Sequence, residues 1–400
     1  MKGNSMVWWA IVLITCILWV GISGSEAKEV RGVTDTSVRI GVIMDQTGPA
    51  ASTLVPTTRA IKNLARHINE NGGIHGRNLE ILIEDDRYSI PSAIAAFKKL
   101  VYKDKIFCLI GPSSGSFVNV LWRKMQKEKL PSMGPSIKVA VEPYKRYLFN
   151  YQDSYEGQIQ VLINYMMKDY KVKDPRVGIM HPDTETGKID LRAALPKLKE
   201  YDIKPVTKEI FMAGAMDASS QVMSLKRHRI NSILNIGTIP STTVTLLRDL
   251  RKFGLKVPVF NSYAAMLGEE LNEMGEVVRM AYFIHATAPW YGEGPEVARL
   301  REITLKYQPG TEKPYRGSSY AAGWLLLTIW TEGIKMAGRD LDEDALIEAL
   351  EGLKNFDTGG LSGPITFSAT SHKGGDSWKI YKSDIVRKQY VALTGWRKSD

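Results

Sequence analysis

The sequence predicts an α/β fold in which two lobes with parallel sheets face each other across one cleft. Short β-branched runs alternate with longer stretches of helical periodicity, which implies parallel strands joined by right-handed crossovers. A second series of such units begins near residue 175, where RVGIM (176–180) echoes RIGVIM (39–44). A chain of 400 residues also exceeds what one hydrophobic core usually serves. Two similar α/β units account for these observations.

The first series alternates clearly between strand and helix. VRIGVIM (38–44) reads as a strand, and Ile61, Leu64, Ala65 and Ile68 then keep the 3.6-residue spacing of a helix over 59–70. LEILIED (79–85) is the next strand. The next helix is 90–104, with Pro91 in its first turn. Two further strands are expected at 106–111 and 130–136.

The second series repeats the pattern of a strand followed by a polar loop. Its strands are RVGIM, SILNIG (232–237) and VPVFNS (257–262). Toward the C-terminus, residues 343–353 have the periodicity of an amphipathic helix, and PITF (364–367) is a short strand. WKIYK (378–382) and QYVAL (389–393) form a terminal hairpin.

Six of the expected strands end in loops rich in Gly, Pro, Ser and Thr. These loops follow Met44, Ile110, Met133, Met180, Ile236 and Phe260. Ligands of open α/β sheets bind outside the carboxyl ends of the strands, at helix N-termini. Two such sheets facing each other bring all six loops around one cleft, which predicts a clamshell for a small molecule.

The N-terminus differs from the rest of the chain. Lys2 precedes the apolar run 6–22, and the small residues of SEA (25–27) fit cleavage of a signal peptide after Ala27. An uncleaved membrane anchor is the alternative, because 17 apolar residues reach the lower length limit of a spanning helix. Either interpretation predicts an exported protein.

Charge and cysteine content exclude several classes of protein. The formal net charge of +10 is spread along the chain, and its densest cluster, KRHR (226–229), follows an apolar helical pattern. Cations at a helix C-terminus explain that cluster without nucleic acid, since no recognition motif accompanies it. Cleavage after Ala27 leaves Cys108 alone in an apolar run, as a buried small hydrophobe without a disulfide.

The stretch GPSSG (111–115) allows two interpretations. As G-x-S-x-G between a strand and a helix, it resembles the nucleophile elbow of a serine hydrolase with Ser113 as nucleophile, and Asp183, Asp217, His285 and His372 follow it in the chain. As a loop before a helix N-terminus, it is an anion cradle of N–H groups and hydroxyls. The cradle is favoured, because five other strands end in similar loops and no H-G-G-G-type oxyanion sequence precedes it.

Metal and cofactor chemistry has little support. The chain has no H-E-x-x-H, no Walker loop and no paired-cysteine site. His181, Asp183 and Glu185 could ligate a metal, but a polar rim of the cleft is favoured because no second ligand cluster has matching spacing. EDD (84–86) is expected to be a capping or solvated acidic turn. We expect no cofactor, no metal and no catalysis.

The order of several longer motifs carries a resemblance. IGVIMDQTGPAAS, INENGGIHGRNLEILIEDD, KLVYKDKIFCLIGPSSGS, GAMDASSQVMSLK, LRKFGLKVP and LSGPITFS occur in this order. In this order the chain resembles, over nearly all of 37–382, the periplasmic substrate-binding proteins of the leucine/isoleucine/valine-binding family, the type I clamshell receptors of ABC importers.

The resemblance implies two lobes joined by three crossovers. Lobe one would comprise 37–153 plus 286–360, and lobe two 154–285 plus 361–395. It implies a periplasmic receptor whose lobes close on the ligand and then dock on a membrane permease, without catalysis. A ligand-sensing module that signals to a membrane partner is the alternative class.

The resemblance also assigns site positions, and most depart from the family's amino-acid receptors. The family's first-lobe serine falls at Gly115, beside Ser113, Ser114 and Ser116. Its second-loop threonine falls at Lys138, after Ser136 and Ile137. The second-lobe tyrosine falls at Thr186 and the ammonium-binding acid at Tyr263, whereas the aromatic wall is kept at Tyr315.

These departures favour an anionic ligand, because a carboxylate is lost and a lysine gained. The hypothesis is a small carboxylate, for example an aromatic one, packed on Tyr263 and Tyr315, with its charge met by Lys138 and the N–H groups of 113–116. The alternative is an aliphatic amino acid whose ammonium is met by Asp183 or Glu185.

Overall fold

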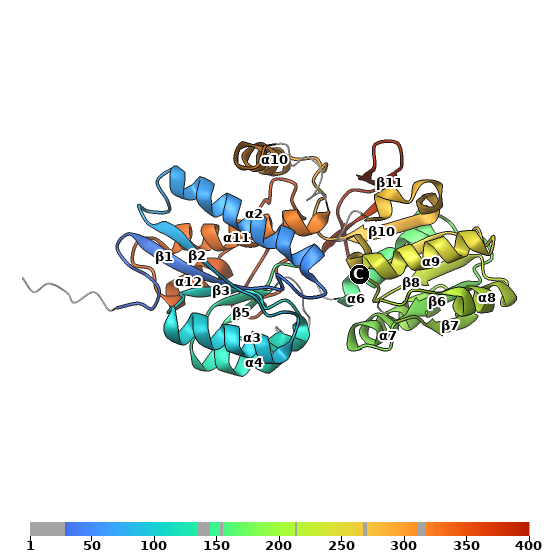
Figure 1. Cartoon of the computed structure of the whole chain (residues 1–400), viewed down its shortest axis with the longest axis horizontal. Helices are drawn as coiled ribbons and strands as arrows, with labels where there is room; N and C mark the ends of the chain where they lie inside the picture. The colour runs from blue at the N-terminus through green and yellow to red at the C-terminus, as the bar shows by residue number, and fades with distance from the viewer. Residues whose placement is uncertain are drawn as a thin grey trace, which may run out of the picture.

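The computed structural model describes residues 29–134, 145–152, 155–212, 214–266, 270–309 and 317–399. The expected signal peptide, residues 1–27, lies outside this part of the chain. Two α/β lobes lie side by side, and the chain passes between them three times (Figure 1). Among the described residues, no helix combines the length and the apolar character needed to cross a membrane.

The first lobe is built on a five-stranded parallel sheet of order β2-β1-β3-β4-β5. Its strands are β1 (Ser37–Ile43), β2 (Asn78–Glu84), β3 (Cys108–Ile110), β4 (Ser132–Gly134) and β5 (Leu148–Asn150). Alternate residues of β3 face opposite layers, since Cys108 and Ile110 lie in one hydrophobic core and Leu109 in the other. The prediction that Cys108 is buried is confirmed.

Helices cover both faces of this sheet. On one face lie α2 (Ala51–Glu70), α11 (Ser318–Ala337) and α12 (Glu343–Glu351), with α10 (Pro295–Tyr307) packed against α2. On the other lie α3 (Ile90–Lys98), continued by a π-helical turn to Lys103, and α4 (Gly115–Lys127). The helix expected over 59–70 begins earlier, at Ala51, although Pro56 lies inside it.

The second lobe is built on a larger mixed sheet of order β12-β11-β10-β9-β8-β6-β7. Its parallel part comprises β6 (Val177–His181), β7 (Thr207–Ile210), β8 (Ser232–Asn235), β9 (Val259–Asn261) and β10 (Ala281–His285). The expected terminal hairpin is confirmed as antiparallel β11 (Ser377–Asp384) and β12 (Gln389–Ala392), and β13 (Arg397–Lys398) pairs with the start of β11.

Four helices cover the second sheet, two on each face. Ile233 of β8 lies in a core with residues of α8 (Ser219–Arg227) and α9 (Pro240–Lys252), whereas the next residue, Leu234, lies in a core with α6 (Tyr155–Asn164) and α7 (Glu185–Lys199). Lys226 and Arg227 occupy the last turn of α8, as the cluster KRHR predicted. The β–α series expected from the sequence is therefore the fold, and the α/β class is confirmed.

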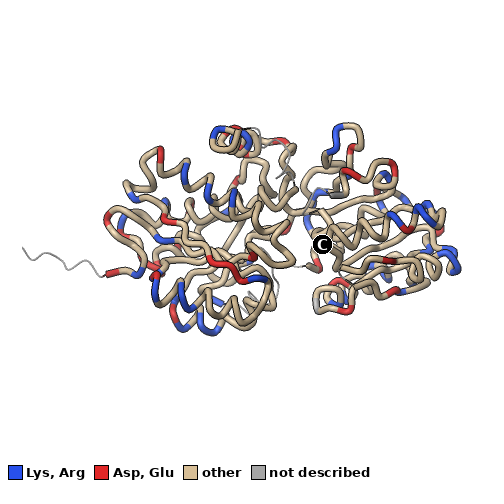
Figure 2. The backbone as a smooth tube through the Cα atoms, in the orientation of Figure 1, with Lys and Arg blue, Asp and Glu red and all other residues tan. Residues whose placement is uncertain are grey.

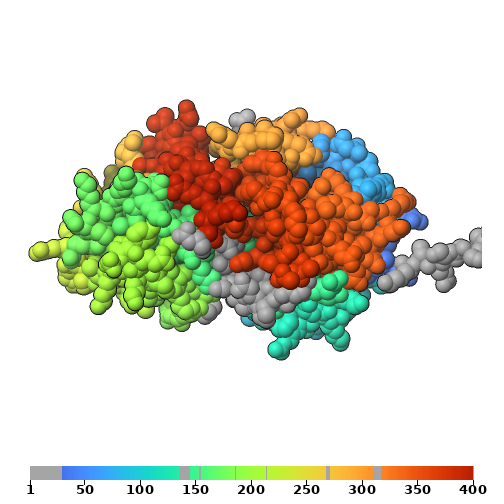
Figure 3. Space-filling view, turned by 180° about the vertical axis from the view of Figure 1, so that it is seen from behind, coloured from blue at the N-terminus to red at the C-terminus, as the bar shows by residue number. Residues whose placement is uncertain are grey.

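Three segments connect the lobes. They lead from β5 to α6, from β10 to α10, and from α12 to β11. A small pocket with room for about one water molecule is lined by residues of all three, among them Tyr151, Ala286 and Ser362. Seen from the back, the C-terminal part of the chain lies at the junction of the two lobes (Figure 3).

The third connecting segment differs from its expected structure. PITF forms no strand, and Ile365 makes only an isolated bridge with Phe356. Leu361, Ile365 and Phe367 pack in the core of the first lobe, although the expected boundary assigned residues from 361 onward to lobe two. Buried apolar side chains thus hold this segment on the first lobe until the chain enters β11. The division of the whole chain into the two predicted residue sets stays a prediction.

Candidate functional site

The loop after β3 belongs to the edge of the first sheet at which its parallel strands end, here called its carboxyl edge. Gly111 has φ +108°, and a Cβ at this position would lie 2.2 Å from the Ile43 carbonyl oxygen, so only glycine fits. This close approach directs the chain into the turn that carries Ser113. The order strand, loop and helix that the sequence predicted around GPSSG is therefore present as β3, the loop 111–114 and α4.

Ser113 is held by two buried aspartates. Its hydroxyl accepts the N–H of Asp45 at 2.7 Å and donates to the carboxylate of Asp86, and its own N–H donates to Asp86 Oδ2 at 3.1 Å. Burial raises the pKa of Asp86, and the bonds from Ser113 oppose that rise. Because its hydroxyl is bonded to a backbone N–H and a carboxylate rather than to a histidine, Ser113 lacks the partner of a serine nucleophile.

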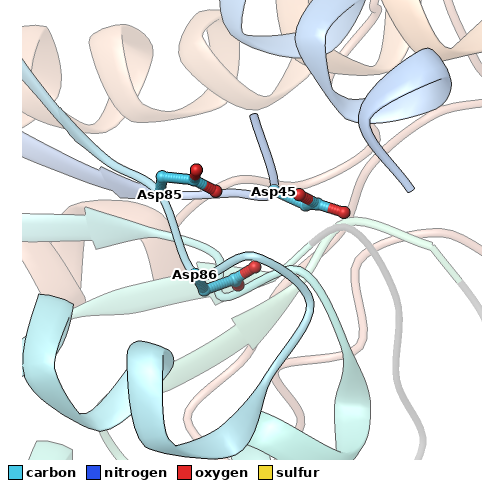
Figure 4. Close-up of side chains that lie close together, drawn as sticks. All are labelled: Asp45, Asp85 and Asp86. Atoms are coloured by element: carbon cyan, nitrogen blue, oxygen red, sulfur yellow. The ribbon is translucent and has the colours of Figure 1, made fainter. Parts of the chain in front are cut away.

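Asp45, Asp85 and Asp86 lie together beneath this loop (Figure 4), with carboxylate oxygens within 4.8 Å of one another. All three carboxylates accept hydrogen bonds from nearby loops. Asp45 accepts the N–H groups of Gly48 and Ala50, and Asp85 accepts those of Gln46 and Arg87 and the hydroxyl of Thr47. A capping or solvated acidic turn was expected at 84–86. These bonds shape the loops before α2 and α3 without capping either helix, and Asp86 is buried rather than solvated.

The N-terminus of α4 presents the rest of the predicted first-lobe site. Ser114 is the N-cap, and its hydroxyl accepts the N–H of Ser116 at 3.3 Å. Gly115 is half-buried and Ser116 is exposed. First-turn N–H groups of a helix favour an anion electrostatically, so the geometry required of an anion cradle is present.

The corresponding loop of the second lobe follows β6. Thr184 caps α7 by accepting the N–H of Gly187 at 3.2 Å, which places Thr186, half-buried, in the first turn of the helix. Asp183 is already engaged, because Lys188 Nζ lies 2.9 Å from its carboxylate. His181 Nδ1 contacts the Pro182 carbonyl. Among the described side chains, His181 and Asp183 belong to no group with metal-ligand spacing, and a polar rim of the cleft stays the interpretation of this loop.

Tyr263 follows β9 and lies in a group of aromatic side chains. Its ring centroid is 5.6 Å from that of Tyr155, 5.5 Å from His285 and 6.4 Å from Trp378. Tyr151, at the end of β5 in the first lobe, is close enough that Tyr263 adds to the rise in its pKa that burial causes. Tyr263 therefore stands at the junction between the lobes, where the sequence analysis expected a ligand-facing residue.

The side chain of Gln158 in α6 is hydrogen-bonded to the backbone of Tyr263. The backbone N–H of Tyr263 donates to Gln158 Oε1 at 2.7 Å. Because an N–H group can only donate, this bond fixes which end of the fully buried Gln158 side-chain amide is the oxygen. Its Nε2 is then left without a protein acceptor among the described residues, and the same holds for Nε1 of buried Trp378. Two buried N–H donors near Tyr263 thus have no hydrogen-bond acceptor among the described residues.

Gln158 and Trp378 were not expected from the sequence to lie at the site. A signal for Gln158 existed, since it is a polar residue inside the apolar stretch IQVLI of a helix. His285 was considered only as a member of a hydrolase triad. It instead lies fully buried at the end of β10, and burial lowers its pKa to about 3.

Four predicted site residues, Ser136, Ile137, Lys138 and Tyr315, lie outside the described residues, as does the side chain of Glu185. Their roles stay predictions. Of the other six, the structure places Ser113, Ser114, Gly115 and Ser116 at the carboxyl edge of the first sheet. Thr186 and Tyr263 lie at the carboxyl edge of the second.

The two carboxyl edges face each other because of the route of the chain. It leaves the first sheet at the end of β5, leaves the second at the end of β10, and re-enters it at the start of β11, which runs antiparallel to β10. All three crossings therefore join carboxyl edges. Two α/β lobes with polar loops and helix N-termini on facing edges have the architecture of a two-lobed solute-binding protein.

Comparison with protein families gives the same class. The model of the family described as "Periplasmic binding protein" matches residues 37–388. The chain belongs to this family, whose members bind solutes and are not enzymes, and the family implies an extracytoplasmic location.

Curated relatives are distant. The chain is 26% identical to the Leu/Ile/Val-binding protein of Escherichia coli K12 over 223 residues, which are 55% of this chain and 59% of that protein. The match thus spans less than two thirds of the E. coli protein. With the Leu/Ile/Val-binding protein BraC3 of Rhizobium johnstonii it is 22% identical over 349 residues, 86% of this chain and 91% of that protein.

Solved structures share the fold. A branched-chain amino acid ABC transporter protein from Thermus thermophilus with bound valine superposes with a TM-score of 0.82 at 18% identity, covering 92% of this chain and 98% of that chain. The fatty acid ABC transporter substrate-binding protein from Thermomonospora curvata gives 0.80 at 20% identity, covering 93% and 95%. Proteins of this fold are therefore named for quite different solutes, and the fold alone assigns none.

Proposed function

We propose that this protein is the extracytoplasmic receptor of an ABC importer and that it captures a small organic carboxylate by closure of its two lobes. Membership of the periplasmic binding protein family supports the receptor function. The route of the chain supports closure, since three thin connecting segments join lobes whose site loops face each other. The permease is the partner that the family implies.

The ligand class rests on one observation, the identity of the groups around Tyr263. The family's amino-acid receptors have an acid at this position, which binds the ligand's ammonium group. Here the tyrosine is accompanied by the free N–H donors of Gln158 and Trp378. N–H donors stabilise a carboxylate or carbonyl oxygen and offer nothing to an ammonium group.

Other described groups point the same way. The N-termini of α4 and α7 both open at the facing edges, and each favours negative charge. Asp183, one of the two acids that could replace the missing ammonium partner, is bonded to Lys188. The aromatic group around Tyr263 supplies apolar surface for the body of the ligand.

A matched pair of ligands tests the proposal. Leucine and 4-methylpentanoate differ only in the α-ammonium group, so thermal unfolding with each isolates its contribution. We expect 4-methylpentanoate or a benzoate-type acid to raise the melting temperature, with about 2.7 kcal/mol of stabilisation at a hundredfold excess over Kd. Stabilisation by leucine but by none of the acids would reject the carboxylate and leave the receptor function intact.

Variants locate the site in the same assay. Tyr263→Ala and Lys138→Met should each abolish the ligand-induced shift. Tyr102→Ala, at an exposed position before β3 and away from the carboxyl edge, should leave it unchanged. Mass spectrometry of small molecules released from the denatured protein identifies the natural ligand. Recovery of no small molecule, together with no shift in the screen, would contradict the receptor function itself.

A further inference from the structure

The end of the second lobe opposite the site carries a concentration of positive charge. Four loops, 168–176, 199–206, 226–231 and 251–258, precede strands β6, β7, β8 and β9. These strands are neighbours in one parallel sheet, so the four loops meet at the same edge, the one remote from the carboxyl edge. We call the exposed Lys and Arg residues of these loops the basic end.

Hydrogen bonds join the four loops into one continuous surface. Arg176 Nε donates to the Arg229 carbonyl at 2.9 Å, and Asn231 Nδ2 donates to the Lys173 carbonyl at 2.8 Å. Lys226 Nζ reaches the Phe253 carbonyl at 3.0 Å. The Val206 N–H donates at 2.9 Å to the carbonyl of Val177, the residue that follows the first loop at the start of β6. The cations therefore belong to a fixed surface rather than to independent loops.

The charge of this surface is strongly unbalanced. The loops contain four, two, three and three Lys or Arg residues, all twelve exposed, against four Asp or Glu residues. The excess of eight positive charges compares with +10 for the whole chain. Two of the four acids are also neutralised by cations outside the loops, since Asp169 pairs with Arg397 and Glu200 with Lys197. Figure 2 shows blue segments gathered at the far end of this lobe.

Helix ends account for part of the basic end. Six of the twelve cations lie in the last turns of helical segments, where they stabilise the helix dipole; Lys199 of α7 and Arg251 of α9 are examples. The other six lie beyond the helix ends, among them Lys173, Lys204 and Lys256. These six cations repel one another. Among the described contacts, only Arg176 forms side-chain hydrogen bonds, and none of the six caps a helix.

The aromatic residues of the loops limit what the basic end can bind. The Tyr170 ring packs on Phe260 and Tyr282, the Tyr201 hydroxyl bonds Asn164, and Phe253 packs against the lobe's core. These rings contact the protein itself, whereas binding of single-stranded nucleic acid uses aromatic side chains on which bases stack. The surface is therefore suited to phosphate groups and not to bases.

We propose that the basic end docks on a membrane surface containing anionic phospholipids. The family implies an extracytoplasmic location. Clusters of four to eight basic residues bind anionic headgroups, and each residue contributes about fivefold to the partition coefficient. Docking through this end leaves the opposite, carboxyl edge of the sheet uncovered. The attraction is screened by salt, because its charges are fully exposed.

Vesicle binding of the full chain tests this. The protein is sedimented with vesicles of phosphatidylcholine alone and with vesicles containing phosphatidylglycerol, at low and at physiological salt. The test variant, Lys173→Glu, Lys204→Glu, Arg227→Glu and Lys256→Glu, changes one residue in each loop. The control variant, Lys62→Glu, Lys98→Glu, Lys103→Glu and Lys127→Glu, makes the same change in net charge at exposed sites of the first lobe.

We expect salt-sensitive binding to the anionic vesicles only, lowered at least about a hundredfold in the test variant and much less in the control. The neutral vesicles report any binding through the apolar N-terminal segment, which needs no anionic lipid. Equal losses in both variants would show a net-charge effect and overturn the proposal. Binding to duplex DNA or heparin without binding to anionic vesicles would overturn it as well.

Discussion

Ser318 Oγ lies 2.9 Å from His285 Nε2, so the first residue of α11 is hydrogen-bonded to the last residue of β10 across the junction of the lobes. His285 Nδ1 accepts the N–H of Thr287 at 3.0 Å, which leaves the proton on Nε2. Nε2 then donates to Ser318 Oγ, whose own proton goes to the Met266 carbonyl at 3.2 Å. The chain of bonds requires a neutral imidazole.

The neutral state of His285 makes stability depend on pH. Because burial lowers its pKa to about 3, below the unfolded value of 6.5, its contribution is complete above pH 6.5 and is lost as pH falls through this window. Lowering the pH from 6.5 to 5 should therefore reduce the free energy of unfolding by about 2 kcal/mol through His285. Denaturant unfolding at several pH values measures this slope.

The His285→Gln variant should show a shallower slope over this pH range. It keeps part of the slope, because burial also lowers the pKa of His372. The same substitution at exposed His228, which lies outside the junction of the lobes, serves as the control. Parallel pH profiles for the wild type and His285→Gln would show that the histidine is not held neutral.

Ser113 is predicted to stabilise the first-lobe loop. Ser113→Ala removes the acceptor of the Asp45 N–H and one donor to Asp86, and should lower the unfolding free energy by about 1–3 kcal/mol. Ser116→Ala, at an exposed position in the first turn of α4, should change the unfolding free energy by less than about 0.5 kcal/mol. Equal effects of the two substitutions on chemical denaturation would contradict this role.

Gly111 tests the close approach of the loop to β1. Gly111→Ala would place a Cβ 2.2 Å from the Ile43 carbonyl oxygen in a left-handed conformation, and should cost more than about 3 kcal/mol. Gly254 also has positive φ, but open space surrounds the position of its Cβ. Gly254→Ala should therefore cost only about 1 kcal/mol, the backbone share. Similar melting temperatures for the two variants would exclude the predicted clash.

Asp190 is a buried acid that should oppose folding at neutral pH. Its Oδ2 accepts the Gly237 N–H at 2.9 Å, its Oδ1 has no partner among the described residues, and burial raises its pKa well above the ordinary value. With the folded pKa raised, stability is complete below the unfolded pKa near 4 and falls as pH rises. Removing the acid should therefore stabilise the protein increasingly toward higher pH.

Asp190→Asn keeps the acceptor for Gly237 and cannot ionise. It should exceed the wild type in unfolding free energy by about 1.4 kcal/mol for each pH unit within the titration window, and match it near pH 4. Asp35→Asn removes an equal charge at an exposed site and is the control. A variant that is less stable than the wild type at pH 8 would show that the Asp190 carboxylate is needed in its ionised form.

Local sequence patterns predicted the parallel α/β units well. The strands at 38–44, 79–85 and 176–180 and the terminal hairpin lie within one or two residues of their expected positions, because apolar periodicity is set by which side chains must be buried. The prediction that PITF forms a strand was wrong for the same reason. Its apolar residues are buried, but in a connecting segment that packs on the first lobe without a neighbouring strand to pair with.

The candidate site was predicted only in part. Ser113 to Ser116 were expected from the end of a local strand pattern, whereas Thr186 and Tyr263 came from the resemblance to the family, and the roles of all six in ligand binding stay predictions. The partners of these residues are not local, since Gln158 is 105 positions from Tyr263 and Asp45 is 68 from Ser113. A local sequence pattern does not show which distant side chains contact each other in the folded protein.

The sequence by itself determined that this protein has two α/β halves with polar loops after their strands, since burial of apolar residues at fixed spacing requires no knowledge of distant contacts. Tertiary structure alone decided the rest. Long-range hydrogen bonds tie Ser113 to two aspartates and leave the N–H groups of Gln158 and Trp378 beside Tyr263. The meeting of four separate loops at one sheet edge concentrates a charge that is dispersed along the chain, because strand order, not sequence order, sets which loops become neighbours.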